Sequence, residues 1–249
     1  MYKSKRIICV VPARLHASRF PKKVLKTLGG KPLLQWVYDA AIGCHIFDEI
    51  IFAVDALETK ELVESFGGVA LMTSERCLNG TARMIEVKQR YSIQGDIWVN
   101  WQADEPFIEK PLILDLLQSI DKPSDVWTLR KKITENHEMQ DPNVVKVIVD
   151  HKDKALYFSR YPIPYHIKAS ELTRYKHLGV YAFTDKALDK IETLEVCDLE
   201  LNESLEQLRF LYYGMSIAVH ETIYKTMGID LQEHLDLAEM SIKTTTVLV

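Results

Sequence analysis

The sequence predicts an α/β fold: a doubly wound, mainly parallel mixed sheet with helices on both faces and an inserted β-rich subdomain. Three observations support this prediction. Short apolar runs alternate with longer stretches of helical periodicity in the first half of the chain. The second half contains strand-like runs separated by a tight polar turn. No linker rich in Gly, Ser or Pro divides the 249 residues, so we expect one domain over 1–249.

In the first half, strands and helices are expected to alternate. The apolar strand over 7–11 precedes a helix over 32–42, where Pro32 suits a first helical turn and apolar residues recur at helical spacing. Strands and helices then follow in the order strand 50–55, helix 59–66, strand 69–73, helix 82–91 and strand 96–102. This alternation is typical of parallel strands joined by crossover helices.

In the second half, the expected elements are mainly strands. A hairpin is predicted from residues 143–150 and 155–160, which flank the polar turn HKDK. Further elements are expected as a strand over 177–184, a helix over 201–214, a strand over 216–221 and a closing helix over 230–243 with Leu231, Leu235, Leu237 and Met240 inside. The inserted subdomain would span about 143–221.

The composition indicates a globular protein. Apolar residues make up 47% of the chain and the formal net charge is −4, so no global positive field favours binding to nucleic acid. The four cysteines are widely spaced, which fits reduced core thiols better than disulfides or a zinc site. The N-terminal apolar run is too short for a signal peptide, and no stretch is long enough to insert in a membrane. These features favour a cytoplasmic protein.

Five cations crowd the segment after the first predicted strand, namely Arg14, Arg19, Lys22, Lys23 and Lys26. Ligands of open α/β sheets bind beyond the carboxyl ends of the strands. Arg and Lys there would neutralise a polyphosphate, and the alternative is a solvated basic loop. The segment Gln102–Pro106 follows another strand, so both are expected at the same crevice. Neither a dinucleotide-binding glycine motif nor a P-loop is present.

Asp104 follows an apolar strand, where a carboxylate is costly to bury without a cation. Mg²⁺ is usually bound by one or two carboxylates together with substrate phosphates. Asp230 is a candidate second ligand because it precedes the last predicted helix, although Asp is also a favoured N-cap residue there. Spacing alone does not decide whether Asp230 is a metal ligand or an N-cap residue.

A series of motifs, in order and with compatible spacing, resembles one family from about residue 6 to 240. The motifs are PAR-x-x-x-SR-x-P-x-K (12–23), NGTAR (79–83), WVNWQADEP (98–106), DPNVVKV (141–147), ALYFSR (155–160), KHLGVYAF (176–183), LEQLRFLYYG (205–214) and GIDLQEHL (228–235). The first motif alone indicates a sugar nucleotidyltransferase. Together they resemble the 3-deoxy-manno-octulosonate cytidylyltransferases, the CMP-Kdo synthetases of lipopolysaccharide biosynthesis.

The resemblance implies a Rossmann-like nucleotidyltransferase fold and a reaction in which CTP and the sugar acid Kdo give CMP-Kdo and pyrophosphate, with Mg²⁺ as cofactor. The anomeric hydroxyl would attack the α-phosphate in line, so catalysis would rest on positioning and charge neutralisation. The resemblance also implies a homodimer, with the sugar-binding and dimerisation residues in the inserted subdomain.

By the same resemblance, Arg14, Lys23 and Asp104 are the expected catalytic residues. The residues expected to bind the nucleotide are Pro12, Ala13, Arg14, Arg19, Lys23, Gly80, Thr81, Arg83 and Gln102. Asp104 and Asp230 would hold the metal. The residues expected to bind the sugar acid are Gln102, Arg160, His177, Tyr181, Glu206 and Gln207, with Arg160 suited to pair with the carboxylate. Lys22 and Lys26 are expected to face solvent.

Several positions depart from the family pattern. Asn79 replaces a Ser, Ala82 replaces an acid next to Arg83, and Ala103 replaces a Gly where a backbone approaches a ligand closely. Loss of the acid at 82 leaves the orientation of Arg83 unexplained. Ala82 and Ala103 leave nucleotide binding without turnover as one alternative function. The same chemistry on 8-amino-Kdo or another 2-keto-3-deoxy sugar acid is a second, because no residue distinguishes these sugars.

Overall fold

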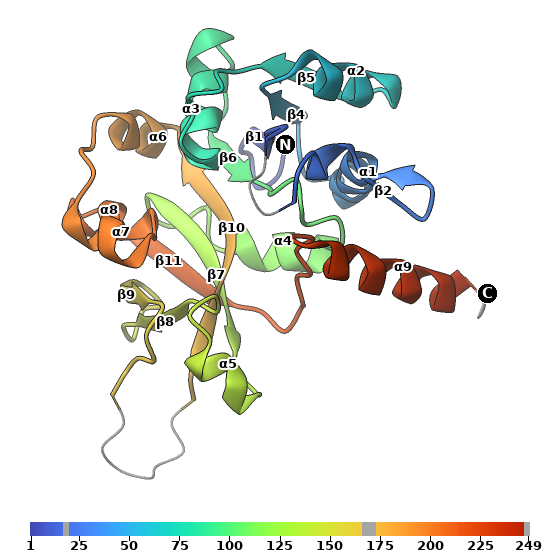
Figure 1. The fold of residues 1–249 in the computed structure, drawn as a ribbon. Coiled ribbons are helices and arrows are strands. Elements are labelled where there is room, and N and C mark those ends of the chain that lie inside the picture. The colour runs from blue at the N-terminus through green and yellow to red at the C-terminus, as the bar shows by residue number, and fades with distance from the viewer. Residues whose placement is uncertain (17–19, 166–172, 247–249) are drawn as a thin grey trace. The chain divides into compact units, whose positions relative to one another are not determined.

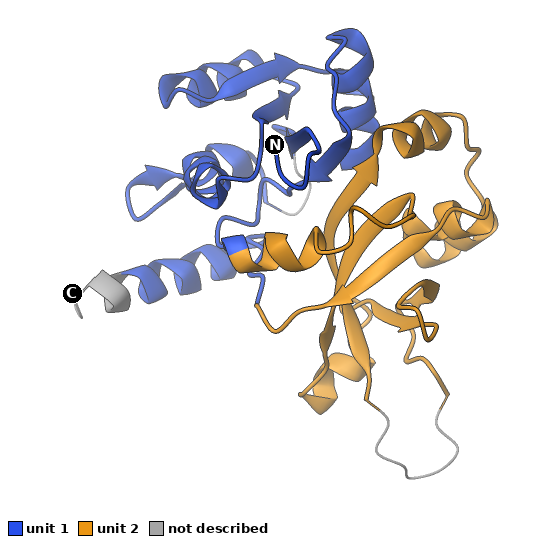
Figure 2. Cartoon of the chain, turned by 180° about the vertical axis from the view of Figure 1, so that it is seen from behind, with its two compact units in different colours: residues 1–110, 225–249 blue, residues 111–224 orange. Residues whose placement is uncertain are grey.

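The computed structural model describes residues 1–16, 20–165 and 173–246. The chain forms two compact units (Figures 1 and 2). Unit 1 contains residues 1–110 and 225–249, and unit 2 contains residues 111–224. Unit 2 is therefore wider than the 143–221 expected for the inserted subdomain.

Unit 1 is built on parallel strands. They are β1 (Ile7–Ala13), β4 (Glu49–Val54), β5 (Val69–Met72) and β6 (Ile97–Asn100), in the order β6-β1-β4-β5. Residues 7–11 of β1 are all buried, as expected for a central strand covered on both faces. The predicted strands of the first half are confirmed. All four carboxyl ends lie at one edge of the sheet, and the strand order reverses at β1, which is where ligands of such sheets bind.

Three helices cover this sheet. They are α1 (Leu33–Cys44), α2 (Leu57–Ser65) and α3 (Gly80–Arg90). Right-handed crossovers place α1 and α2 on one face and α3 on the other, as the ribbon shows (Figure 1). Asn79 caps α3, because its side chain accepts a hydrogen bond from the amide of Ala82 at 2.8 Å. Asn79 thus satisfies one of the free amides in the first turn of α3, as expected for an N-cap residue.

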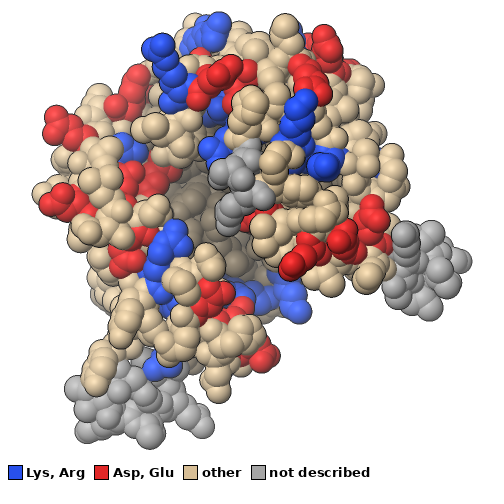
Figure 3. Space-filling model, in the orientation of Figure 1, with Lys and Arg blue, Asp and Glu red and all other residues tan. Residues whose placement is uncertain are grey.

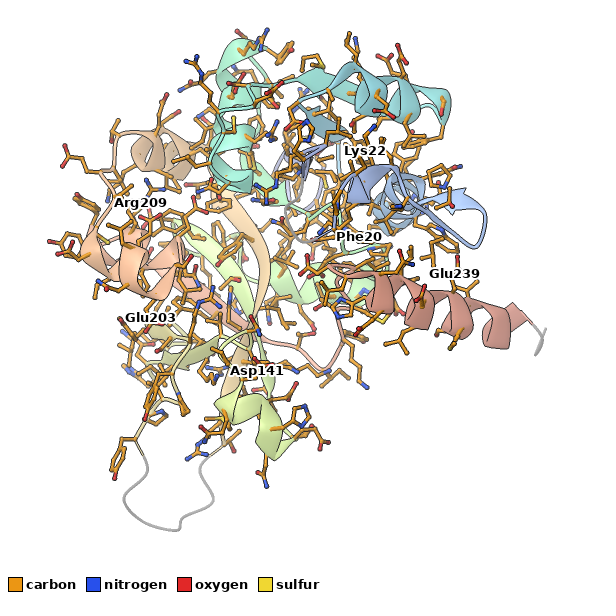
Figure 4. The ribbon with its side chains drawn as sticks, in the orientation of Figure 1. Phe20, Lys22, Asp141, Glu203, Arg209 and Glu239 are labelled. Carbon is orange, nitrogen blue, oxygen red and sulfur yellow. The ribbon has the colours of Figure 1, made fainter. Side chains whose placement is uncertain are left out.

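The rest of unit 1 packs beside α1. It consists of the short 3-10 helix η1 (Lys23–Leu25), strands β2 (Thr27–Leu28) and β3 (Lys31–Pro32), and the closing helix α9 (Gln232–Thr246). Phe20 packs with Leu33 of α1 and with Leu235 and Ala238 of α9. The labelled Phe20 lies between these helices in Figure 4.

The buried side of α9 differs from the expected one. Leu235 and Ala238 are buried, whereas Leu231, Leu237 and Met240 are exposed, so the prediction of these three as inside residues is wrong. Acidic side chains gather over α9 on the face in Figure 3. The closing helix therefore buries only a narrow stripe of apolar side chains. Its sequence pattern would fit a wider buried face equally well.

Unit 2 combines antiparallel and parallel pairing. Strand β7 (Val126–Lys132) pairs with β10 (Tyr175–Thr184) antiparallel and with β11 (Ile217–Glu221) parallel. The predicted hairpin is confirmed as β8 (Lys146–Val149) and β9 (Ala155–Ser159), which pair antiparallel. The helices are α4 (Lys110–Leu116), α5 (Asn136–Gln140), α6 (Asp185–Glu192), α7 (Asp198–Glu203) and α8 (Gln207–Tyr212).

The single helix predicted over 201–214 is wrong. The chain forms α7 and α8 instead, separated at Ser204, whose φ of 52° is left-handed. A left-handed residue ends a helix, and for a residue with a Cβ this conformation depends on surrounding contacts rather than on local preference.

Among the described helices, none combines the length and the apolar character needed to cross a membrane. The thiols of Cys9, Cys44, Cys77 and Cys197 are free, as the spacing predicted.

Lys146 of β8 is a fully buried cation. Its ammonium donates to the carbonyl oxygens of Asp141 at 2.7 Å, Val144 at 2.7 Å and Arg160 at 2.9 Å. Burial lowers the pKa of Lys146. The three carbonyls come from two separate segments, so this one side chain holds the 141–145 segment against the end of β9.

We expect Lys146→Met to lower the free energy of unfolding by about 3 kcal/mol, because three buried carbonyls lose a charged donor. Chemical denaturation of both proteins measures the change. Lys152→Met, at an exposed position in the turn between β8 and β9, is the matched control and should change stability by less than about 0.5 kcal/mol. Equal stability of the two variants would contradict this account of Lys146.

Candidate active site

A cavity of about 310 Å³ lies in unit 1 at the carboxyl ends of the parallel strands. It brings together eight of the residues predicted to bind nucleotide or metal, namely Pro12, Arg14, Lys23, Gly80, Arg83, Gln102, Asp104 and Asp230. The prediction that the basic segment and the Gln102–Pro106 turn meet at one crevice is therefore confirmed. Lys22 lies at the surface, as expected, and pairs there with Glu58 at 3.1 Å.

Among the described residues, two of those predicted to bind the nucleotide do not line this cavity. Ala13 is fully buried at the end of β1. Thr81 is buried in the first turn of α3. Arg19 lies outside the described residues.

The ammonium of Lys23 lies between two carboxylates. Its Nζ donates to Oδ2 of Asp104 at 2.6 Å and to Oδ1 of Asp230 at 2.9 Å. Lys22 adopts a left-handed conformation (φ 52°) and starts the 3-10 turn that places Lys23. The two acids meet although they are distant in sequence, because the amide of Ile229 donates to the carbonyl of Asp104 at 2.8 Å.

This pair of acids fits a divalent cation. Both carboxylates contact one nitrogen, so their oxygens are no further apart than the two hydrogen bonds allow. No cluster of three or more potential ligands occurs among the described residues. Two carboxylates without further protein ligands match Mg²⁺, which takes its remaining ligands from water and substrate phosphates.

Glu105 is a third acid at this site that the sequence did not single out. Burial, together with the neighbouring carboxylates of Asp104 and Asp230, raises the pKa of Glu105 to about 8. Its Oε2 is buried without a hydrogen-bond partner. Glu105 is therefore largely protonated at neutral pH and adds little negative charge beside the two metal-ligand candidates.

Gly80 lets the start of α3 approach β1 and β6 closely. A Cβ at this position would lie 3.1 Å from Nδ2 of Asn100 and 3.2 Å from Cγ of Pro12. Asn100 is buried and accepts a hydrogen bond from the side-chain amide of Gln102 at 3.0 Å. Asn100 is thus a further residue that shapes the cavity wall, and its polar side chain inside a predicted buried strand was the signal in the sequence.

Arg83 is almost completely buried in the cavity wall. One guanidinium nitrogen donates to Oδ2 of Asp55 at 3.0 Å, and another donates to the hydroxyl of Thr73. The orientation of Arg83 is therefore fixed without an acid at position 82. Sequence reasoning missed Asp55, although its place at the end of an apolar strand resembles that of Asp104.

Unit 2 contains a separate pocket of about 390 Å³. Of the residues predicted to bind the sugar acid, His177, Tyr181 and Gln207 line it. The wall also includes residues 143–145 and Leu205. Gln102 lines the cavity in unit 1 instead, and Arg160 and Glu206 are not part of the described pocket lining.

His177 and Tyr181 are uncharged. Burial lowers the pKa of His177 to about 3. Burial first, and then the charge of Glu206, raise the pKa of Tyr181 well above its usual value. Both side chains therefore offer neutral hydrogen-bonding groups, which suit hydroxyls rather than phosphates.

The hydroxyl of Thr128 assigns the tautomer of His177. This oxygen lies 2.9 Å from Nε2 of His177, 3.1 Å from the carbonyl of Leu178 and 2.9 Å from that of Val180. A hydroxyl has one proton, which the carbonyls require, so His177 must donate from Nε2. Its Nδ1 is then an acceptor.

Arg160 braces the segments that form this pocket. Its guanidinium donates to the carbonyl oxygens of Glu203 at 2.6 Å, Pro142 at 2.9 Å and Ser204 at 3.2 Å. The Glu203 carboxylate in turn accepts from the Ser159 hydroxyl at 2.6 Å and the Arg160 amide at 2.8 Å.

Glu206 faces a cation. It lies 3.4 Å from Arg209 of α8. Figure 4 labels Arg209 and also Glu203 in the α7–α8 region. The negative charge of Glu206 also contributes to the raised pKa of Tyr181. Glu206 therefore lies near the pocket that Tyr181 lines.

The chain is similar to known cytidylyltransferases. The family model described as cytidylyltransferase matches residues 8–217. The 3-deoxy-manno-octulosonate cytidylyltransferase of Thermodesulfovibrio yellowstonii is 40% identical, over 95% of this chain and 98% of its own. The 8-amino-3,8-dideoxy-manno-octulosonate cytidylyltransferase of Shewanella pealeana is 37% identical, over 94% and 97%.

The fold is also similar to that of a solved structure. The CMP:2-keto-3-deoxy-manno-octonic acid synthetase, solved in complex with CTP, superposes with a TM-score of 0.91 at 36% identity, over 96% of this chain and 99% of its own. The family match over most of the chain, and the relative that is 40% identical over nearly its whole length, show that the chain belongs to the cytidylyltransferase family, among the 3-deoxy-manno-octulosonate cytidylyltransferases.

Proposed function

We propose that this enzyme transfers the cytidylyl group of CTP to 3-deoxy-manno-octulosonate and releases pyrophosphate. The observation that supports this most directly is the cavity of unit 1, where Lys23 lies between Asp104 and Asp230 and where Arg14 and Arg83 add two further cations. Such a set of charges matches a triphosphate with a divalent cation.

In the proposed reaction the anomeric hydroxyl of the sugar acid attacks the α-phosphorus of CTP. The new O–P bond forms as the bond to the β-phosphate oxygen breaks, and the hydroxyl proton is lost to solvent. Arg14 and Lys23 would bind the phosphate oxygens and stabilise the negative charge of the transition state. Asp104 and Asp230 would hold Mg²⁺, which when bound supplies charge neutralisation at the phosphates.

The pocket of unit 2 is the proposed site for the sugar acid. Its neutral His177, Tyr181 and Gln207 would bind hydroxyls, with Nδ1 of His177 accepting one hydrogen bond. We also propose a homodimer in the cytoplasm, where the four free thiols stay reduced. Exposed Leu156, Tyr161 and Leu201 of unit 2 are candidate interface residues.

Pyrophosphate release tests the function. We expect release when the enzyme is mixed with CTP, Mg²⁺ and 3-deoxy-manno-octulosonate, because the cavity charges match these ligands. The 8-amino sugar acid is assayed in parallel, since one relative of similar identity is named for it. CTP binding without release from any sugar acid would favour the binding-only alternative. Faster turnover with UTP or GTP would contradict the CTP assignment.

We expect Asp104→Asn to lower kcat by about 100-fold, because the amide is a weaker ligand for Mg²⁺ than the carboxylate. Steady-state rates over a Mg²⁺ titration measure the effect. Glu61→Gln, at an exposed position on α2, removes one negative charge elsewhere in unit 1 and should leave the rates unchanged. A near-normal kcat at saturating Mg²⁺ would show that Asp104 is not a ligand.

We expect Arg160→Lys to raise the KM for the sugar acid by about tenfold, or ~1.4 kcal/mol, and the KM for CTP much less. Lysine cannot reproduce the three carbonyl contacts that brace the unit 2 pocket. Initial rates with each substrate varied in turn measure both constants. The opposite order would assign Arg160 to the nucleotide.

A further inference from the structure

Asp55 joins two parts of the unit 1 cavity. It directly follows β4, and its side chain is 7% exposed. Oδ1 accepts a hydrogen bond from the amide of Leu15 at 2.8 Å, and Oδ2 accepts one from Arg83 at 3.0 Å. One carboxylate therefore holds both the backbone after β1 and a side chain of α3.

The first contact fixes the backbone at Leu15, where the basic segment begins. Leu15 follows Arg14 directly, and Arg14 is exposed where it lines the cavity. A loop that is already held in its binding conformation loses less conformational entropy when a ligand binds. The Asp55–Leu15 hydrogen bond thus pre-organises the position from which Arg14 reaches a polyphosphate.

The second contact fixes Arg83. Its guanidinium spans the Asp55 carboxylate at the end of β4 and the Thr73 hydroxyl just after β5. Thr73 donates its own proton to the carbonyl of Val54 at 2.9 Å, so its oxygen is free to accept from Arg83. These two contacts leave further N–H groups of the guanidinium for a ligand in the cavity that Arg83 lines.

The charge of Asp55 is required at this position. Arg83 is 3% exposed, and a buried guanidinium without a carboxylate partner is strongly unfavourable. Residue 82, the neighbour of Arg83 in the sequence, is Ala and supplies no carboxylate. Asp55 supplies the carboxylate from a different element of the fold.

We propose that Asp55 is a positioning residue for the nucleotide: it fixes Arg83 and the backbone after Arg14 in one arrangement and thereby sets the affinity for CTP. The inference rests on the proposed function, in that CTP is the ligand of the unit 1 cavity. Asp55 contacts neither substrate in this account and acts only through the two groups that it holds.

The test compares Asp55→Asn with Asp48→Asn. The Asn at 55 keeps an acceptor for Leu15 but loses the charge that Arg83 needs. Asp48 is a matched control because its carboxylate also has two partners. It accepts a hydrogen bond from the amide of Ile7 at 2.8 Å and pairs with the N-terminal ammonium at 2.9 Å. These contacts lie at the amino end of β1, whereas the cavity lies at the carboxyl ends of the strands. Calorimetry measures the Kd for CTP, and initial rates measure the KM of each substrate.

We expect Asp55→Asn to raise the Kd and KM for CTP by about tenfold and to leave the KM for the sugar acid within about twofold. Asp48→Asn should leave all three constants within about twofold. Equal CTP affinity in the two folded variants would overturn the inference, as would an equal rise in both KM values, which indicates a general structural role. Absence of CTP binding by the unsubstituted enzyme would instead refute the proposed function.

A second variant covers the case in which Asp55→Asn does not fold. Asp55→Glu keeps the charge but moves the carboxylate by one methylene group relative to Arg83 and to the amide of Leu15. We expect it to raise the Kd for CTP by about threefold, because the two contacts can no longer both form in their present geometry. A folded Asp55→Glu enzyme with an unchanged Kd for CTP would overturn the inference.

Discussion

The ion pairs of Lys23 with Asp104 and Asp230 determine how unit 1 is organised around its cavity. Two carboxylates this close repel each other unless a cation lies between them, and the partly buried ammonium provides it. The interaction joins η1, the turn after β6 and the segment before α9, which are far apart in sequence. The backbone hydrogen bond from Ile229 to Asp104 fixes the same arrangement, so geometry and charge support each other.

The other strand ends contribute polar groups in a similar way. Asp55 follows β4, Thr73 follows β5, and Asn100 closes β6. These side chains accept hydrogen bonds from the amide of Leu15, which follows Arg14, and from two groups that line the cavity, the guanidinium of Arg83 and the side-chain amide of Gln102. Parallel strands bring these ends to one edge, so a set of short side chains on rigid elements can hold the longer ones that meet a ligand.

The sequence predicted the apolar strands of unit 1 and the meeting of the basic segment with Asp104, because continuous apolar runs mark buried parallel strands. It did not predict β7, whose second half is polar, or the break at Ser204. Those features depend on partners elsewhere in the chain. The orientation of Arg83 is the clearest case: its neighbour Ala82 left it unexplained, and the carboxylate that fixes it comes from Asp55, 28 positions away.

The two pockets differ in the physical basis of recognition, and the difference matches two kinds of ligand. The unit 1 cavity is ionic, with Arg14, Lys23 and Arg83 beside two carboxylates, so its affinity should respond to ligand charge. In unit 2, burial keeps His177 and Tyr181 neutral, while Lys176 adds one cation to the pocket lining. The two neutral side chains would discriminate by the placement of hydroxyls. In the proposed reaction, CTP would be held mainly by its phosphates in the unit 1 cavity and the sugar acid by its hydroxyls in the unit 2 pocket. The different polar chemistry of the two pockets would then allow one chain to bind two unlike substrates.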